Sequence, residues 1–210
     1  MTGLSTAYPE HAEDVLTQWL TWRASGKAAL VIVTATEGGA VRRPGALMAV
    51  SEDGRRAGYV SGGCIDADIA LQAQASLKSG TPARLRYGAG SPFVDMPMPC
   101  GGAIEIAILP GPDMEAARTL RDRLHARQSV VTNLTASGEL VLSPAASENA
   151  AVFRYSPKLR LRIAGRGADC LALARIAAVS GIETEIQLRD EADRQEALAQ
   201  GLSNVLALET

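Results

Sequence analysis

The sequence has few aromatic residues and little net charge, and both shortages argue against nucleic-acid binding. Aromatic residues make up only 4% of the 210 residues, so the stacking platforms of single-stranded nucleic-acid binders are scarce. The formal net charge is −2, which gives no electrostatic footprint for nucleic acid. We therefore expect no nucleic-acid partner.

Long apolar runs and histidines are also scarce. No window approaches the roughly 18–20 apolar residues that a membrane span needs, and residues 1–10 lack the features of a secretory signal. We expect a cytoplasmic protein with no membrane partner. The two histidines, His11 and His125, supply acid–base chemistry poorly, and no Ser/His/Asp set stands out. The chain is therefore not expected to be an enzyme.

The apolar pattern predicts an α/β protein, with an N-terminal α+β domain built on a mixed sheet and an incomplete Rossmann-like βαβαβ unit after it. In the first part it favours helices over residues 11–23, 65–77 and 113–127, and strands over residues 28–35, 47–50, 57–60, 84–87, 103–109, 129–134 and 139–142. In the second part it favours strands over residues 159–164, 183–188 and 204–208, and helices over residues 168–180 and 191–199. We expect domains at residues 1–142 and 157–210, joined by a linker at 143–156.

The sequence has three cysteines, Cys64, Cys100 and Cys170, an odd number at wide spacing that does not indicate a secreted disulfide framework. A zinc site is not expected either, because Cys64 and Cys100 do not belong to CxxC pairs. Cys64 follows two glycines and opens a predicted helix, where unpaired backbone N–H groups favour thiolate over thiol. Cys100 precedes two glycines that lead into a predicted strand. Two such sulfur donors suit a soft metal centre or sulfur chemistry, although free cysteines are often buried small apolar side chains.

Three blocks in a fixed order resemble the XdhC/CoxI family of molybdenum-enzyme accessory proteins. They are residues 38–45 (GGAVRRPG), residues 61–66 (SGGCID) and residues 100–106 (CGGAIEI). The resemblance implies a cytoplasmic chaperone that binds molybdenum cofactor and supports its sulfuration with a cysteine desulfurase. It also implies delivery of the cofactor to a xanthine dehydrogenase-type apoenzyme.

The blocks and the resemblance together select the candidate site. Cys64 and Cys100 are assigned to cofactor contact, which includes a contact with molybdenum, or to sulfur protection. Close approach of the cofactor to the backbone is assigned to the glycine pairs Gly62, Gly63, Gly101 and Gly102. Phosphate binding is assigned to Arg42 and Arg43, with a solvated loop as the alternative. Glu105 matches the acidic position after CGG, and its alternative is a salt bridge at the strand end.

The second part contains an altered dinucleotide-binding pattern. Gly165 and Gly167 lie between a predicted strand and a predicted helix, as in G-x-G-x-x-G. Cys170 replaces the third glycine, and Asp169 would place negative charge near the phosphates. Gly165 and Gly167 are therefore weak nucleotide candidates, and NAD(P) is not expected.

The sequence also allows two alternative functions and favours one form of self-association. One function is an NAD(P)-dependent oxidoreductase built on the C-terminal unit, and the other is a cysteine-based sulfur carrier that acts without a pterin. An uncovered parallel strand edge near the C-terminus favours a homodimer.

Overall fold

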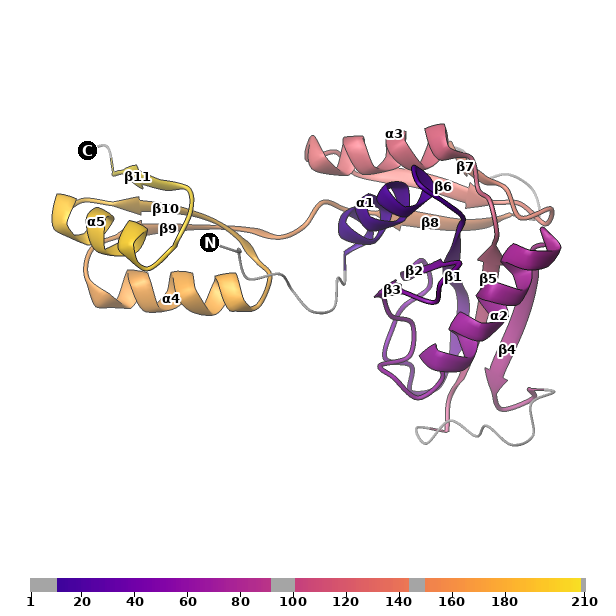
Figure 1. Cartoon of the computed structure of the whole chain (residues 1–210). Coiled ribbons are helices and arrows are strands. Elements are labelled where there is room, and N and C mark those ends of the chain that lie inside the picture. Colours follow the sequence, from indigo (N-terminus) through magenta and orange to yellow (C-terminus); the bar gives the residue numbers. More distant parts are fainter. Residues whose placement is uncertain (1–10, 92–100, 144–149, 209–210) are drawn as a thin grey trace. The chain divides into compact units, whose positions relative to one another are not determined.

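The structure is a computed structural model that describes residues 11–91, 101–143 and 150–208. The chain forms two compact units, which meet in sequence between Pro157 and Lys158. The predicted α/β class is confirmed, since both units combine helices with strands (Figure 1). Within the described ranges, no helix has both the length and the apolar character needed to cross a bilayer.

A five-stranded sheet is the centre of the first unit. Its strands are β1 (Ala28–Glu37), β2 (Leu47–Ser51), β3 (Arg56–Gly58), β4 (Ala83–Gly88) and β5 (Ala103–Leu109), in the order β3-β2-β1-β5-β4. Every neighbouring pair is antiparallel, which corrects the mixed sheet expected from the sequence. The reason is that β1, β2 and β3 follow one another through short connections that reverse the chain, whereas parallel neighbours need a long crossover.

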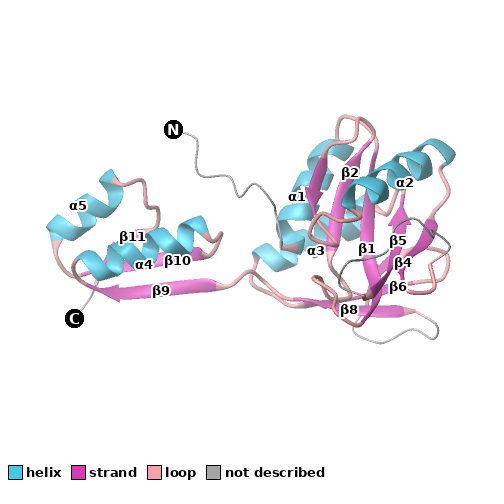
Figure 2. Cartoon of the chain, turned by 90° about the horizontal axis from the view of Figure 1, so that it is seen from below, coloured by secondary structure: helices cyan, strands magenta, loops and turns pink. Residues whose placement is uncertain are grey.

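Both faces of this sheet are buried, because its central strand is apolar on both sides. Residues 28–33 of β1 are all buried, and their side chains alternate between the two faces. One face packs against α2 (Asp66–Ser79), and the other forms a core cluster with α1 (Ala12–Arg23) and α3 (Met114–His125) (Figure 2). The two helix layers pack against both faces of the sheet, so the ends of β1 and β5 can position a site.

A second sheet adds to the cluster that contains α1 and α3. Its strands are β6 (Val130–Leu134), β7 (Leu140–Leu142) and β8 (Ala151–Tyr155), in the antiparallel order β7-β6-β8. β8 falls inside the stretch 143–156 that we expected to be a linker. Phe153 and Tyr155 are buried and alternate with exposed neighbours. The polar residues that precede this strand, and its length of five residues, obscured the alternation in the sequence.

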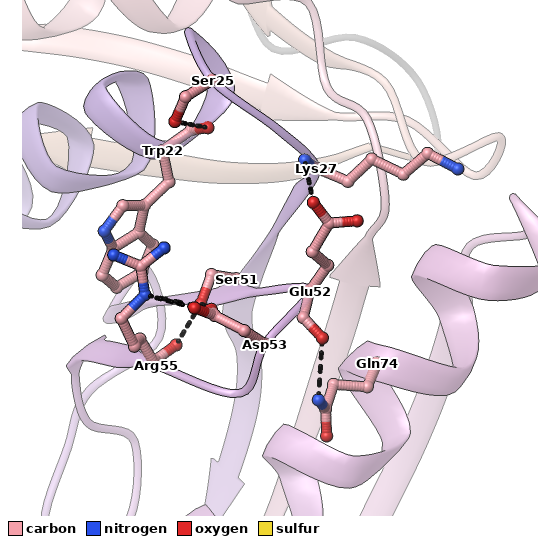
Figure 3. Close-up of polar contacts among 8 residues, drawn as sticks. All are labelled: Trp22, Ser25, Lys27, Ser51, Glu52, Asp53, Arg55 and Gln74. Carbon is pink, nitrogen blue, oxygen red and sulfur yellow. Dashed lines mark hydrogen bonds and ion pairs between the residues drawn. The ribbon is translucent and has the colours of Figure 1, made fainter.

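The predicted Asp-Gly hairpin joins β2 to β3, and its turn is anchored to α1 (Figure 3). Gly54 adopts a positive φ of 87°, which favours glycine. The Asp53 carboxylate accepts hydrogen bonds from the Ser51 hydroxyl and from Arg55 Nε, the latter at 3.0 Å, and these contacts lower the pKa of Asp53. The Arg55 guanidinium lies over the ring of Trp22, 5.3 Å from its centroid.

Glu52 connects the same turn to β1 and α2. Its carboxylate accepts a hydrogen bond from the backbone N–H of Lys27 at 3.4 Å, and its carbonyl oxygen accepts one from Gln74 Nε2 at 3.0 Å (Figure 3). One short turn therefore contacts three elements of the first unit.

The second unit consists of β9 (Arg160–Gly165), α4 (Ala168–Val179), β10 (Glu183–Leu188), α5 (Glu191–Ala199) and β11 (Val205–Ala207). The strands are parallel in the order β11-β10-β9, which agrees with the predicted βαβαβ order. Both helices share a core cluster with apolar residues of β9 and β10. Alternate residues of these strands form cross-strand ion pairs, Arg160 with Glu183 at 2.6 Å and Arg162 with Glu185 at 2.7 Å. These ion pairs make the sheet face that points away from the apolar cluster polar.

Candidate functional site

The ends of β1, β4 and β5 meet at one edge of the first sheet, which we call the glycine edge (residues 37–39, 88 and 101–103). Glu37 and Gly88 are both register partners of Ala103. A Cβ atom on Gly102 would lie 2.8 Å from the Glu37 carbonyl oxygen, and one on Gly88 would lie 2.1 Å from the Gly102 carbonyl oxygen. Because Cβ atoms do not approach backbone so closely, contact between the strands themselves requires glycine at positions 88 and 102.

The four glycines that we selected differ in the space around them. A Cβ on Gly62 would make an ordinary contact with the Val41 side chain at 3.5 Å, whereas Gly102 has no room for a Cβ. Around Gly63 and Gly101, no heavy atom of the described chain lies within 4 Å of a Cβ position. Both residues adopt a positive φ, 117° and 67°. Gly63 and Gly101 therefore leave open space beside the backbone, and of the four only Gly102 is enclosed by backbone atoms.

The loop of residues 38–45 contacts both glycine segments. A Cβ on Gly38 would lie 3.2 Å from the Cα of Gly102. Three residues further on, Val41 lies against Gly62. The structure therefore brings together the block 38–45, the block 61–66 and residues 101–102, which are far apart in the sequence.

Asp66 holds the turn between β3 and α2 from the inside. Its buried carboxylate accepts hydrogen bonds from the backbone N–H groups of Val60, Ser61 and Gly63, at 2.9, 3.2 and 2.7 Å. It also accepts one from the Ser61 hydroxyl at 3.0 Å. We expected unpaired N–H groups near Cys64, but Asp66 already pairs with these three amides.

Cys64 is exposed at the surface of this turn, and its Sγ donates a hydrogen bond to the Ser61 carbonyl oxygen at 3.7 Å. The alternative that Cys64 is a buried apolar side chain is therefore wrong. Cys100 lies outside the described residues, so its convergence with Cys64 and the molybdenum contact of both thiols stay predictions. Among the residues that the structure describes, no group of three or more His, Cys, Asp or Glu side chains is placed to hold a metal ion.

Arg86 of β4 connects three strands at the glycine edge through its side-chain contacts. It forms salt bridges with Glu37 of β1 and Glu105 of β5, each with a shortest distance of 2.8 Å. Its Nε also donates a hydrogen bond to the Ala89 carbonyl oxygen at 2.9 Å. The hydrogen bonds and positive charge of Arg86 lower the pKa of Glu37. Glu105 thus forms the salt bridge that we kept as the alternative to a direct role, and that direct role stays a prediction.

Sequence reasoning did not select Asp66 or Arg86. The sequence contained two signals for Asp66. It is the last residue of the SGGCID block, and it lies in the first turn of a predicted helix, where carboxylates are favoured. For Arg86 no local signal existed, since its partners Glu37 and Glu105 are 49 and 19 residues away.

The two selected arginines extend from the glycine edge toward a groove. The Arg42 guanidinium lies over the Tyr59 ring, 4.5 Å from its centroid, and is half-buried, whereas Arg43 is exposed. Both residues line a groove of about 540 Å³ that also includes Arg154 of β8. Arg42 is therefore held against the protein, which differs from the solvated loop that we considered.

In the second unit, an acidic side chain accepts a hydrogen bond from the backbone of the glycine turn. The backbone N–H of Gly167 donates a hydrogen bond to Asp193 Oδ2 of α5 at 2.5 Å. A Cβ on Gly165 would lie 2.7 Å from the Sγ of Cys170. In a dinucleotide-binding site, the amide at the position of Gly167 would face the pyrophosphate. In this chain the same amide is hydrogen-bonded to the Asp193 carboxylate instead.

Comparison with known proteins supports the family resemblance. Residues 21–88 match the profile of the XdhC and CoxI family. Over 170 residues, the chain is 37% identical to a protein named molybdenum cofactor insertion chaperone PaoD from Escherichia coli (strain K12). The aligned region is 77% of this chain and 53% of that protein, so the chain spans about half the length of this curated relative.

A solved structure has the same fold. It is a crystal structure from Bacillus halodurans named as a xanthine dehydrogenase, with a TM-score of 0.72 and 21% sequence identity. The match covers 93% of this chain and 68% of that chain. At this identity the likeness shows the fold alone. The family profile includes the blocks 38–45 and 61–66 and ends before residues 101–103.

Proposed function

The chain belongs to the XdhC and CoxI family, and we propose that it is an accessory chaperone that binds molybdenum cofactor as its cargo. The proposal includes sulfuration of the bound cofactor with a cysteine desulfurase and delivery to a xanthine dehydrogenase-type apoenzyme in the cytoplasm. The name of the curated relative, an insertion chaperone for the same cofactor, supports binding and handover. In this proposal the chain carries a cargo and does not turn over a substrate.

One observation carries the proposal: the loop of residues 38–45 contacts both Gly102 at the glycine edge and Gly62 in the turn that carries the exposed thiol of Cys64. A molybdenum pterin presents a metal held by dithiolene sulfur at one end and a phosphate at the other. A binder therefore needs a soft donor, open space and positive charge. Cys64 would supply the donor, Gly63 and Gly101 leave the space, and Arg42 with Arg43 carry the charge.

A homodimer is a separate part of the proposal. In the second unit, β9 and β11 are each paired with β10 alone among the described strands, and an unpaired strand edge is a ready surface for another chain. Sedimentation analysis tests the idea. A species with the mass of two chains at micromolar concentration is expected, and a monomer alone would contradict the dimer.

The two alternative functions make different demands. An oxidoreductase would need the amide of Gly167 for a dinucleotide, and that amide is paired with Asp193. A sulfur carrier without a pterin would need only the exposed Cys64. Among the described residues, no contact favours either alternative over cofactor binding.

Replacing Cys64 tests the proposed function. The protein is co-expressed with molybdenum-cofactor synthesis, and bound molybdenum and pterin are measured per chain. We expect Cys64→Ala to lower retention by about tenfold or more, as loss of groups around a metal often does. Cys170→Ala is the matched control and is expected to retain the cofactor, because Cys170 lies in the other unit.

The outcomes separate the functions. Unchanged retention in both Cys64→Ala and Cys100→Ala would remove the thiol assignment. Tight binding of NAD with no pterin would favour the oxidoreductase. A persulfide on Cys64 of a protein that never carries a pterin would favour the sulfur carrier.

A further inference from the structure

A basic groove lies in the first unit between the start of α1, the loop of residues 41–47 and the end of β8. Its lining residues are His11, Ala12, Val41, Arg42, Arg43, Pro44, Gly45, Ala46, Leu47, Arg154, Tyr155 and Ser156. Three of them are arginines, one is a histidine, and none of these described lining residues is acidic. The chain as a whole has a formal net charge of −2, so positive charge is concentrated at this groove and favours an anion.

A second cavity in the same unit makes a useful contrast. It measures about 400 Å³ and is lined by Arg23 and Lys27 together with Glu139. Its charges are mixed, whereas those of the basic groove have one sign. The basic groove is therefore the better anion site of the two.

Tyr155 supplies a second and independent observation. Its side chain is only 6% exposed and lines the basic groove. Its hydroxyl is buried and has no hydrogen-bond partner among the described residues. Burial raises the pKa of Tyr155, so the phenol stays protonated and can donate. Buried polar groups in native proteins are nearly always paired, so this hydroxyl is a candidate donor to a ligand in the groove.

The basic groove also adjoins the turn that carries Cys64. Val41 lines the groove and contacts Gly62 in the turn that carries Cys64. Arg42 is already oriented by its contact with the Tyr59 ring, so less conformational freedom is lost when it binds an anion. A single ligand could therefore extend from the groove toward the exposed thiol.

We propose that the basic groove binds the phosphate-bearing end of a small anionic molecule, with Arg43 and Arg154 pairing with phosphate oxygens and Tyr155 donating a hydrogen bond. The volume of about 540 Å³ falls within the range of small-molecule sites. Arginine suits this role because its planar fork binds two phosphate oxygens at once. The identity of the molecule as molybdenum cofactor rests on the proposed function, whereas the anion site itself rests on the groove.

Calorimetric titration of the full chain with inorganic pyrophosphate tests the site. Binding is expected, and Arg154→Gln and Tyr155→Phe should each weaken it by about tenfold or more, since hydrogen bonds to charged groups are worth at least that factor. The matched control is Arg118→Gln, which removes the same charge from an exposed position on α3. It should bind pyrophosphate like the parent chain. Circular dichroism checks that each variant is folded.

Two results would overturn the anion site. One is that the parent chain does not bind pyrophosphate, and the other is that folded Arg154→Gln and Tyr155→Phe bind it as tightly as Arg118→Gln does.

Cofactor retention then separates this proposal from the proposed function. If Arg154→Gln weakens both pyrophosphate binding and cofactor retention, the groove holds the phosphate of the cargo. If it weakens only pyrophosphate binding, the assignment of the groove to the cofactor is wrong. Loss of the thiol assignment through Cys64→Ala would leave the pyrophosphate result standing.

Discussion

The two units each contain a glycine turn between a strand and a helix, with Cys64 in the first turn and Cys170 in the helix that follows the second, yet different carboxylates bind the amides of the two turns. In the first, Asp66 of the adjoining helix pairs with three backbone amides, and Cys64 is exposed. In the second, Asp193 of a different helix pairs with one amide of the turn. Cys170 is only partly exposed, with its sulfur directed toward Gly165.

The difference shows why a glycine pattern alone does not identify an anion site. In both turns a carboxylate of the protein already occupies backbone N–H groups that a phosphate could have bound. The first turn differs in that the thiol of Cys64 is exposed and that the neighbouring loop carries Arg42 and Arg43. In our proposal, positive charge for a phosphate comes from side chains in the basic groove rather than from either glycine turn.

The largest expected effect comes from removing the carboxylate of the first turn. Asp66→Ala leaves three amides and a hydroxyl without their acceptor and should lower the free energy of unfolding by about 3 kcal/mol. Asp66→Asn keeps an acceptor oxygen and should lose about 1 kcal/mol. Urea denaturation measures both. Equal losses in the two variants would show that the acceptor contacts do not hold the turn.

The second expected effect concerns the two thiols. With Cys100 replaced by alanine, iodoacetamide should modify Cys64 on the order of tenfold faster than Cys170, because modification requires an accessible sulfur. Mass spectrometry of the digested protein gives both rates. In urea the two rates should become similar, which controls for differences in local sequence. Similar rates in the folded protein would contradict the comparison.

A smaller effect is expected at the second turn. Asp193→Ala removes one hydrogen bond and should cost about 1 kcal/mol, seen as faster hydrogen exchange of the Gly167 amide. Asp190→Ala removes the same charge from the start of α5, where the side chain makes no capping hydrogen bond. It should leave exchange at Gly167 unchanged. An equal effect of both variants would mean that charge, and not the Asp193 contact, protects the amide.

The smallest effect is a pH dependence at the glycine edge. Arg86 lowers the folded-state pKa of Glu37 below its ordinary value. The ion pair therefore stabilises the protein above the ordinary pKa of a glutamate, about 4.3, and its contribution is lost as the pH falls through the lowered folded value. Glu37→Gln should make unfolding slightly less sensitive to acid, and the exposed control Glu139→Gln should not. The fraction of unfolded protein, measured at a fixed urea concentration while the pH is lowered, compares the two variants.

The sequence predicted those elements whose signals are local. The strand over residues 103–109, the strand over 183–188 and the helix over 191–199 have the same bounds in the structure, because each combines a clear apolar period with turn residues at its ends. The Asp-Gly turn between β2 and β3 was likewise readable, since its geometry depends on four neighbouring residues.

Features that depend on distant contacts were missed. β8 exists because Phe153 and Tyr155 can pack beside β6, which its own five residues do not reveal. The antiparallel order of the first sheet and the Arg86 salt bridges arise only when separate strands meet. The same limit applies to the basic groove, where Arg154 comes from β8 and joins Arg42 and Arg43 from a loop about 110 residues earlier in the sequence.

For the candidate site, the resemblance went further than the residue patterns did. It named blocks at 38–45 and 61–66 that the structure places in contact. It did not distinguish Gly63, which borders open space, from Gly102, which is required by backbone packing. That distinction depends on whether another segment of the chain lies against the glycine, as at Gly102, or leaves nothing within 4 Å of a Cβ position, as at Gly63, and no local pattern describes this.

The placement of the tryptophans in α1 has an optical consequence. Trp19 and Trp22 are the chain's only tryptophans, and no Trp, Tyr or Phe follows Tyr155. Intrinsic fluorescence and near-ultraviolet absorbance therefore report on the first unit and are silent for the second. Since Arg55 lies over Trp22, any rearrangement of the β2–β3 turn should change the emission, which gives a label-free signal from the unit that carries Cys64.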